Sequence, residues 1–126
     1  MTEPTQFDER YLKGIEYFNE FEFFEAHEVW EDLWQDFHGH GRTFYQGLIQ
    51  VAVCLHHFVN GNIRGARKLF NSSTKYLSEY GDLYEGLDLV KFIGDLTTCC
   101  QEILDSTEEY PKIEINADLI PEIHLS

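Results

Sequence analysis

The chain has 126 residues, 43% of them hydrophobic and 15% aromatic, which allows one substantial core but not two independent ones. Its 23 acidic and 9 basic residues give a net charge of −14, which argues against a protein that coats nucleic acid or an anionic membrane. No apolar run approaches the roughly 20 residues of a membrane span, and the first residues lack the order of a signal peptide. We therefore expect a cytoplasmic protein.

The charge falls into three blocks along the chain. Residues 1–40 contain 11 acids and 2 bases, residues 41–78 contain 5 bases and no acid, and residues 79–126 contain 12 acids and 2 bases. A basic middle block between two acidic blocks predicts that helices or subunits meet there, because opposite charges attract.

Proline positions indicate a chain of successive helices. All three prolines lie outside residues 5–110, and proline disrupts helix interiors. Turn-forming residues divide this part into about five helices, near residues 8–19, 22–37, 43–59, 62–80 and 86–106. Residues 107–126 alternate too briefly to form a sheet and predict an extended tail on the helical body of residues 8–106. The predicted class is an all-α bundle, a single domain over residues 1–126.

Two of these helices carry matching apolar stripes at an offset of 40 residues. The matching pairs are Phe18 and Phe58, Phe21 and Gly61, Phe23 and Ile63, Ala26 and Ala66, Trp30 and Phe70, and Phe37 and Leu77. This pattern predicts two related helical hairpins of the tetratricopeptide type, with the fifth helix closing the core.

The helix over residues 43–59 is apolar around most of its circumference, which is typical of a central helix. Its one polar stripe contains Gln46, Gln50 and His57. An unpaired buried amide costs roughly 1–3 kcal/mol, so these side chains must find partners.

Partners are available on the preceding helix, where His27 and Glu31 lie one turn apart at the edge of the apolar face. If that edge faces the polar stripe, the side chains converge in a pocket between the second and third helices. The predicted pocket residues are His27, Glu31, Gln46, Gln50, His57, Trp34 and Tyr45.

Three interpretations of this pocket stay open. The first is a buried network that only fixes helix register. The second is a small-molecule or catalytic site, with Glu31 and His57 as the acid/base pair and His27 as an orienting group. The third is a divalent-metal site of His27, Glu31 and His57. Its basis is the similarity of residues 27–31 to a His-Glu-x-x-His zinc motif with Glu31 as the last residue.

Cysteine chemistry has little support in the sequence. Cys54, Cys99 and Cys100 form no Cys-x-x-Cys pattern, which predicts reduced, structural thiols.

The helix over residues 62–80 carries a basic stripe opposite its apolar face, made of Arg64, Arg67, Lys68 and Lys75. We expect ion pairs with acidic helices of the same chain or of another subunit. A phosphate-bearing ligand or an acidic partner is the alternative. The function class that rivals a ligand pocket is therefore an interaction module, including a homo-oligomer.

Four segments, in this order, resemble one family. They are Phe24–Glu31 (FEAHEVWE), Gln46–Gln50 (QGLIQ), Leu55–His57 (LHH) and Gly61–Ala66 (GNIRGA). Together they resemble the small prokaryotic helical family known as domain of unknown function 309, over about residues 8–80. The resemblance implies an all-helical fold and places the family's pattern on Glu25, His27, Trp30, Glu31, Gln46, Gln50 and His57. It implies no reaction, so it leaves open whether the protein is an enzyme.

Overall fold

The computed structural model describes residues 7–126, so the first six residues of the predicted domain lie outside this description. Within the described part, five α-helices form a bundle with a small two-stranded hairpin. The helices are α1 (Glu9–Asn19), α2 (Phe23–Asp36), α3 (Arg42–Val59), α4 (Ile63–Leu77) and α5 (Leu89–Asp105), and the strands are β1 (Leu83–Tyr84) and β2 (Leu87–Asp88). The predicted all-α class is therefore confirmed for the bundle, and the hairpin is an addition.

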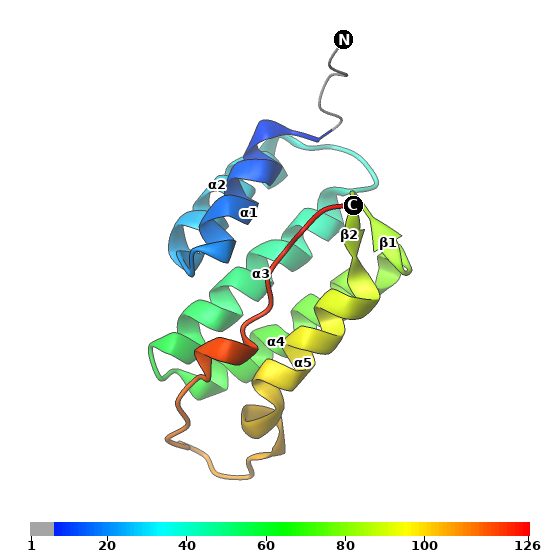
Figure 1. The fold of residues 1–126 in the computed structure, drawn as a ribbon. Coiled ribbons are helices and arrows are strands. Elements are labelled where there is room, and N and C mark those ends of the chain that lie inside the picture. The colour runs from blue at the N-terminus through cyan, green and yellow to red at the C-terminus, as the bar shows by residue number, and fades with distance from the viewer. Residues whose placement is uncertain (1–6) are drawn as a thin grey trace.

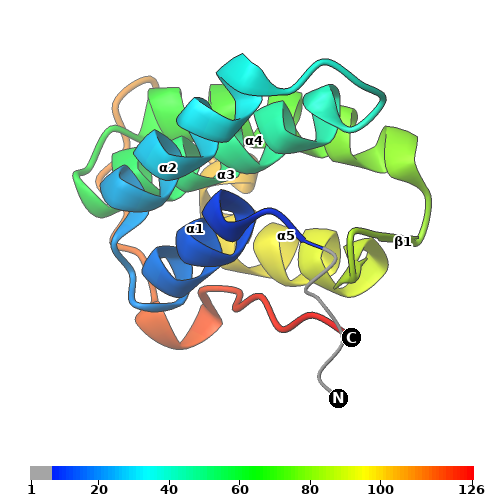
Figure 2. The same ribbon diagram turned by 90° about the horizontal axis from the view of Figure 1, so that it is seen from above.

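Helix α3 lies at the centre of the bundle (Figure 1). Seen from above, α2, α3 and α4 form one layer, and α1 and α5 lie in front of it (Figure 2). Half of the 18 residues of α3 are buried, among them Phe44, Leu48, Val51 and Leu55. Because burial of one such side chain stabilises the fold by roughly 1.5–3 kcal/mol, α3 contributes more to the core than any other helix. None of the described helices has the length and apolar character that crossing a membrane requires.

The two turns that lead into α2 and α4 have the same backbone structure. Phe21 in the first turn has a φ of 64°, and Gly61 in the second has a φ of 81°. In each turn a main-chain N–H donates to the carbonyl five residues earlier, at 2.9 Å in the first and 2.8 Å in the second. Phe21 and Gly61 are also one of the pairs that lie 40 residues apart. The two turns therefore share a left-handed backbone conformation, which favours glycine.

The β hairpin changes the predicted bounds of the last two helices. Glu85 and Gly86 form its tight turn with positive φ angles of 50° and 73°, as a two-residue hairpin loop requires. Asp88 then caps α5, because its carboxylate accepts the N–H of Lys91 at 3.0 Å. As a result α5 begins at Leu89 rather than near residue 86, and α4 ends at Leu77 in a 3₁₀ turn over Ser78–Tyr80.

The tail after α5 runs extended across the front of α3, between α1 and α5, with one 3₁₀ turn at Ala117–Leu119 (Figure 1). Ile120 and Ile123 are buried in this crossing. The Asn19 side chain makes two hydrogen bonds to the main chain of Ile123. It donates to the carbonyl oxygen at 2.9 Å and accepts from the N–H at 2.8 Å. The tail therefore forms part of the core.

Helix α1 approaches α2 closely at Gly14. The indole N–H of Trp30 donates to the carbonyl of Tyr11 at 3.1 Å, and the Trp30 ring covers Gly14 so closely that a Cβ there would overlap it. The absence of a side chain at this position lets the two helices meet.

A pair of glycine substitutions tests this contact. Gly14→Ala should lower the free energy of unfolding by about 2 kcal/mol, because the added methyl overpacks the core. Gly94→Ala, at an exposed position of α5 with open space around the added Cβ, should raise it by about 0.5–1 kcal/mol through helix propensity. Urea denaturation measures both, and equal effects of the two substitutions would contradict the packing argument.

All three cysteines are free and buried, in agreement with the predicted structural thiols. The Cys54 thiol donates to the carbonyl of Ala66 at 3.2 Å. Hydrogen bonding to Cys100, followed by burial, raises the pKa of Cys99. Hydrogen bonding to Cys54, with burial, raises the pKa of Cys100.

We expect these thiols to be unreactive in the folded protein, because the thiolate is the nucleophile. Burial protects all three, and the raised pKa values of Cys99 and Cys100 also suppress their thiolates. Titration with a thiol reagent at pH 8 should label no cysteine of the native protein and all three in denaturant. Rapid labelling of any cysteine without denaturant would show that this part of the core is open.

Candidate functional site

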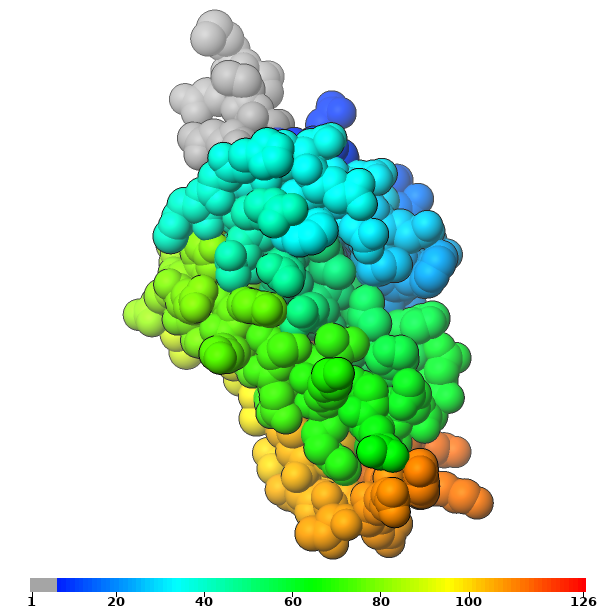
Figure 3. Space-filling view, turned by 180° about the vertical axis from the view of Figure 1, so that it is seen from behind, coloured from blue at the N-terminus to red at the C-terminus, as the bar shows by residue number. Residues whose placement is uncertain are grey.

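The predicted site residues lie mainly on the side of the molecule opposite the tail. We call this side the α2–α3–α4 face, and Figure 3 views the molecule from it. It is made of three stripes of half-buried side chains, one from each helix. The stripes are His27, Glu31 and Trp34 on α2, Gln46, Ile49, Gln50, Val53 and His57 on α3, and Leu69, Ser72 and Tyr76 on α4.

On α2, His27 and Glu31 are neighbours, as their spacing predicts. Nε2 of His27 lies 3.1 Å from a carboxylate oxygen of Glu31, and Nδ1 lies 3.1 Å from the carbonyl oxygen of Phe24. His27 is therefore held by its own helix.

On α3, the polar side chains with partners bind α4. The hydroxyl of Ser72 donates to the side-chain oxygen of Gln50 at 2.5 Å. The Asn62 amide donates to Nδ1 of His57 at 3.3 Å. Burial, and then the neighbouring His56, lowers the pKa of His57, so its ring is neutral at pH 7. These contacts fix the register between α3 and α4, which is what the network interpretation predicts.

The structure gives His57 and Glu31 different partners. Consecutive residues of a helix point about 100° apart, and it is His56 whose ring faces α2, with its centroid 5.9 Å from that of Phe24. Glu31 is paired with His27 and His57 with Asn62. The proposed acid/base pair of Glu31 and His57 is therefore not formed.

The predicted pocket residues also lie too far apart along α3 to surround one small ligand. Gln46 and His57 are eleven residues apart in one helix, which is roughly 16 Å at about 1.5 Å per residue. They form a strip along the helix rather than a pocket. Over residues 7–126, no three histidine, cysteine or acidic side chains converge to hold a metal ion. The predicted metal set of His27, Glu31 and His57 is therefore not assembled, because His57 faces α4.

The two aromatic residues of the predicted pocket have different positions. Tyr45 is buried in the core against Phe37, with ring centroids 5.2 Å apart, and burial raises its pKa. Trp34 lies on the face, where the guanidinium of Arg42 stacks 4.0 Å from its ring centroid. Trp34 Nε1 and Arg42 Nε are buried and lack a hydrogen-bond partner among the described residues. This stacking was not predictable from helical spacing, because it joins the end of one helix to the start of the next.

The basic stripe of α4 divides into two pairs. Arg67 caps the end of α5 by donating to the carbonyls of Ile103 at 2.9 Å and Ser106 at 3.5 Å. Arg64 lies 4.0 Å from a carboxylate oxygen of Glu109. Lys68 and Lys75 are exposed and form no ion pair within the described part of the chain. The expected intrachain ion pairing is thus limited to Arg64.

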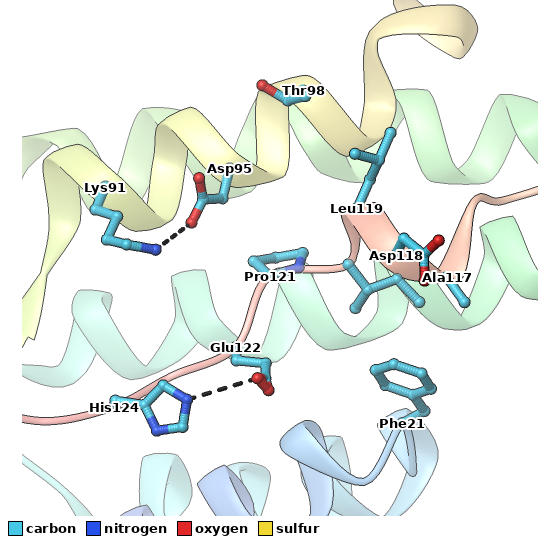
Figure 4. A pocket seen from close by; sticks show the side chains of 11 residues that line it. Phe21, Lys91, Asp95, Thr98, Ala117, Asp118, Leu119, Pro121, Glu122 and His124 are labelled. Atoms are coloured by element: carbon cyan, nitrogen blue, oxygen red, sulfur yellow. Dashed lines mark hydrogen bonds and ion pairs between the residues drawn. The ribbon is translucent and has the colours of Figure 1, made fainter.

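The structure has a cavity away from the α2–α3–α4 face and a smaller one at His27. One of about 490 Å³ lies between α5 and the tail, beside Phe21 (Figure 4). Four of its charged or ionisable side chains lie in pairs, since Lys91 lies 2.7 Å from Asp95 and His124 lies 3.6 Å from Glu122, and Asp118 also lines it. The sequence could not indicate this cavity, because it depends on the path of the tail. A smaller cavity of about 170 Å³ is lined by His27, Glu28, Glu31 and Asp32.

A double-mutant cycle tests the contact between α3 and α4. Gln50→Ala and Ser72→Ala should each lower the free energy of unfolding by about 1 kcal/mol, and the double variant should lose little more than either alone. Gln46→Ala is the control, because it removes a similar side chain that makes no hydrogen bond within residues 7–126, and it should cost less than about 0.5 kcal/mol. Fully additive losses in thermal unfolding would mean that the two side chains do not interact.

Comparisons with known proteins bear on identity. Residues 11–69 match the DUF309 family, described as a domain of unknown function. An uncharacterized protein of Aquifex aeolicus (strain VF5) is 28% identical over 99 residues, covering 77% of this chain and 28% of the relative. The uncharacterized protein YpuF of Bacillus subtilis (strain 168) is 34% identical over 99 residues, covering 75% of this chain and 56% of the relative.

The matched parts therefore cover little more than half of YpuF and less than a third of the Aquifex protein. The match to the family spans α1, α2, α3 and the first half of α4. The family resemblance of the sequence is confirmed: the chain contains a DUF309 domain at residues 11–69, which include His27, Glu31, Gln46, Gln50 and His57.

Proposed function

We propose that the chain is an interaction domain that binds a polypeptide partner through the α2–α3–α4 face. The observation that carries this proposal is the difference between the two sides of α3. On the front, the chain's own tail fills the space between α1 and α5 and buries Ile120 and Ile123 (Figure 1). On the opposite side, no segment of residues 7–126 crosses the three stripes (Figure 3).

The chemistry of the face suits a polypeptide. Its apolar members are Trp34, Ile49, Val53, Leu69 and Tyr76, all half-buried. Gln46 and the other polar side chains between them can donate and accept hydrogen bonds. A strip roughly 16 Å long matches about eleven residues of a helix or five of an extended segment. Aromatic and aliphatic contacts mixed with polar groups are typical of protein interfaces.

The two-hairpin organisation supports the same proposal. The positions matched by the 40-residue offset include Ala26 and Ala66, both buried, and the turns with Phe21 and Gly61 share one backbone conformation. Stacked helical hairpins of this kind present extended surfaces to partners. We interpret α1–α2 and α3–α4 as two such units, with α5 and the tail closing the core.

A small-ligand, metal or catalytic role has less support. The polar residues lie along a strip, Glu31 and His57 have separate partners, and the cavity at His27 is lined by side chains of α2 alone. The geometry therefore favours an extended contact over an enclosed site.

Site-specific photocrosslinking in cells tests the proposal. A photoreactive residue in place of Gln46, on the α3 stripe of the face, should give covalent adducts with a polypeptide. The same residue in place of Val90, which is 63% exposed on α5, should not. Mass spectrometry identifies the adduct, and circular dichroism confirms folding of both variants. Absence of adducts at position 46, or equal yields at both positions, would contradict the proposed function.

A further inference from the structure

We infer that the partner of the α2–α3–α4 face is a second copy of this chain, related to the first by a two-fold axis parallel to α3. This inference rests on the proposed function, because it names the partner of the same face. The charge of the two edges, the symmetry of the contact and the register of the helices favour this partner.

The two edges of the face carry opposite charge. Glu28 and Asp32 are exposed on the outer side of α2, and Lys68 and Lys75 are exposed on the outer side of α4. No ion pair within residues 7–126 involves any of these four side chains. Helix α2 contains no basic residue, and residues 41–78 contain no acidic one. The face thus has a free acidic edge and a free basic edge.

Symmetry decides how two such faces can meet. A two-fold axis in the plane of the face and parallel to α3 places α3 on α3 and each α2 on the second copy's α4. An axis in the same plane but perpendicular to α3 would place α2 on α2, with acid facing acid. Only the first arrangement pairs the acidic edge with the basic edge, and it does so twice, as a self-complementary interface requires.

The register of the helices places the charges at the same height. Two contacts near the C-terminal end of α3 fix the positions of α2 and α4 along it. Phe24 of α2 lies against His56, and Asn62, which precedes α4, binds His57. Both α2 and α4 run antiparallel to α3. Residues of α2 and α4 that lie about 40 positions apart in the sequence are therefore at the same height along α3. Glu28 is therefore level with Lys68. Since a two-fold axis parallel to α3 leaves height unchanged, Glu28 faces Lys68 of the second copy.

The centre of the face is suitable for the same contact. Val53 lies on its mid-line, Ile49 lies toward α2, and Trp34 and Leu69 flank the two, so the interface has a half-buried apolar centre and a charged rim. An 18-residue α3 is about 27 Å long, and axes 8–10 Å apart make the face about 18 Å wide. The buried area is then roughly 1,000 Å² for both copies, the lower limit for a specific interface. We therefore expect a dimer of about micromolar affinity.

Charge reversal on the two edges tests the inference with the purified 126-residue chain. The basic-edge variant is Lys68→Glu with Lys75→Glu, and the acidic-edge variant is Glu28→Lys with Asp32→Lys. Sedimentation equilibrium should show a dimer for the wild type and at least tenfold weaker self-association for each variant alone. An equimolar mixture of the two variants should dimerise within about threefold of the wild type, because every contact again pairs opposite charges.

The matched control is Lys13→Glu with Lys112→Glu, which changes the net charge as much as the basic-edge variant but lies off the face. It should dimerise like the wild type. A dimer that resists both edge variants, or a mixture that fails to associate, would overturn the inference. So would a wild type that stays monomeric at 100-fold the expected dissociation constant.

The two proposals fail in different ways. In the purified dimer, the photoreactive residue at position 46 should crosslink to the second copy. Adducts in cells with only a different polypeptide, together with a monomeric purified chain, would overturn the dimer and leave the proposed function standing. A lack of adducts in cells and in the purified protein would overturn both.

Discussion

The fold depends on the burial of α3. A helix of 18 residues that is apolar around most of its circumference cannot face water on any broad side. Helices α2 and α4 flank it, and α1, α5 and the tail cover its front (Figure 2). The tail is essential to this cover, because Ile120 and Ile123 occupy the space between α1 and α5, where Asn19 fixes the main chain. What remains of α3 at the surface is one narrow stripe, and this stripe is the centre of the α2–α3–α4 face.

Much of the fold could be predicted from the sequence because its signals are local. Helix periodicity, the position of the prolines and turn residues indicate each helix to within a few residues, and helical spacing alone makes neighbours of His27 and Glu31. The β hairpin was not predictable in this way, since strands of two residues show no periodicity. The path of the tail was not predictable either, because it depends on the hydrogen bonds of Asn19 to a residue 104 positions away.

The candidate site was predictable only in part, because the direction of a side chain depends on which neighbour its helix faces. The sequence places Gln46, Gln50 and His57 on one polar stripe, but α4 binds Gln50 and His57 while α2 meets His56. Tyr45 is buried because its ring packs against Tyr11 and Phe37, which come from other parts of the chain. The rise of the helix, by contrast, separates Gln46 from His57 by roughly 16 Å, so their spacing along the chain is enough to exclude a compact pocket.

The net charge of −14 opposes self-association at long range, so a dimer must depend on local charge. At physiological ionic strength, exposed charges more than about 8 Å apart are largely screened. An ion pair such as Glu28 with Lys68 of a second copy acts at a shorter distance. Salt therefore weakens this attraction less than it weakens the long-range repulsion between the two copies. Arg64 and Arg67 contribute little to such contacts, because the end of α5 and the residues after it already occupy them. The free charge of the basic block is therefore concentrated on Lys68 and Lys75, at the one edge where an acidic helix of another copy could lie.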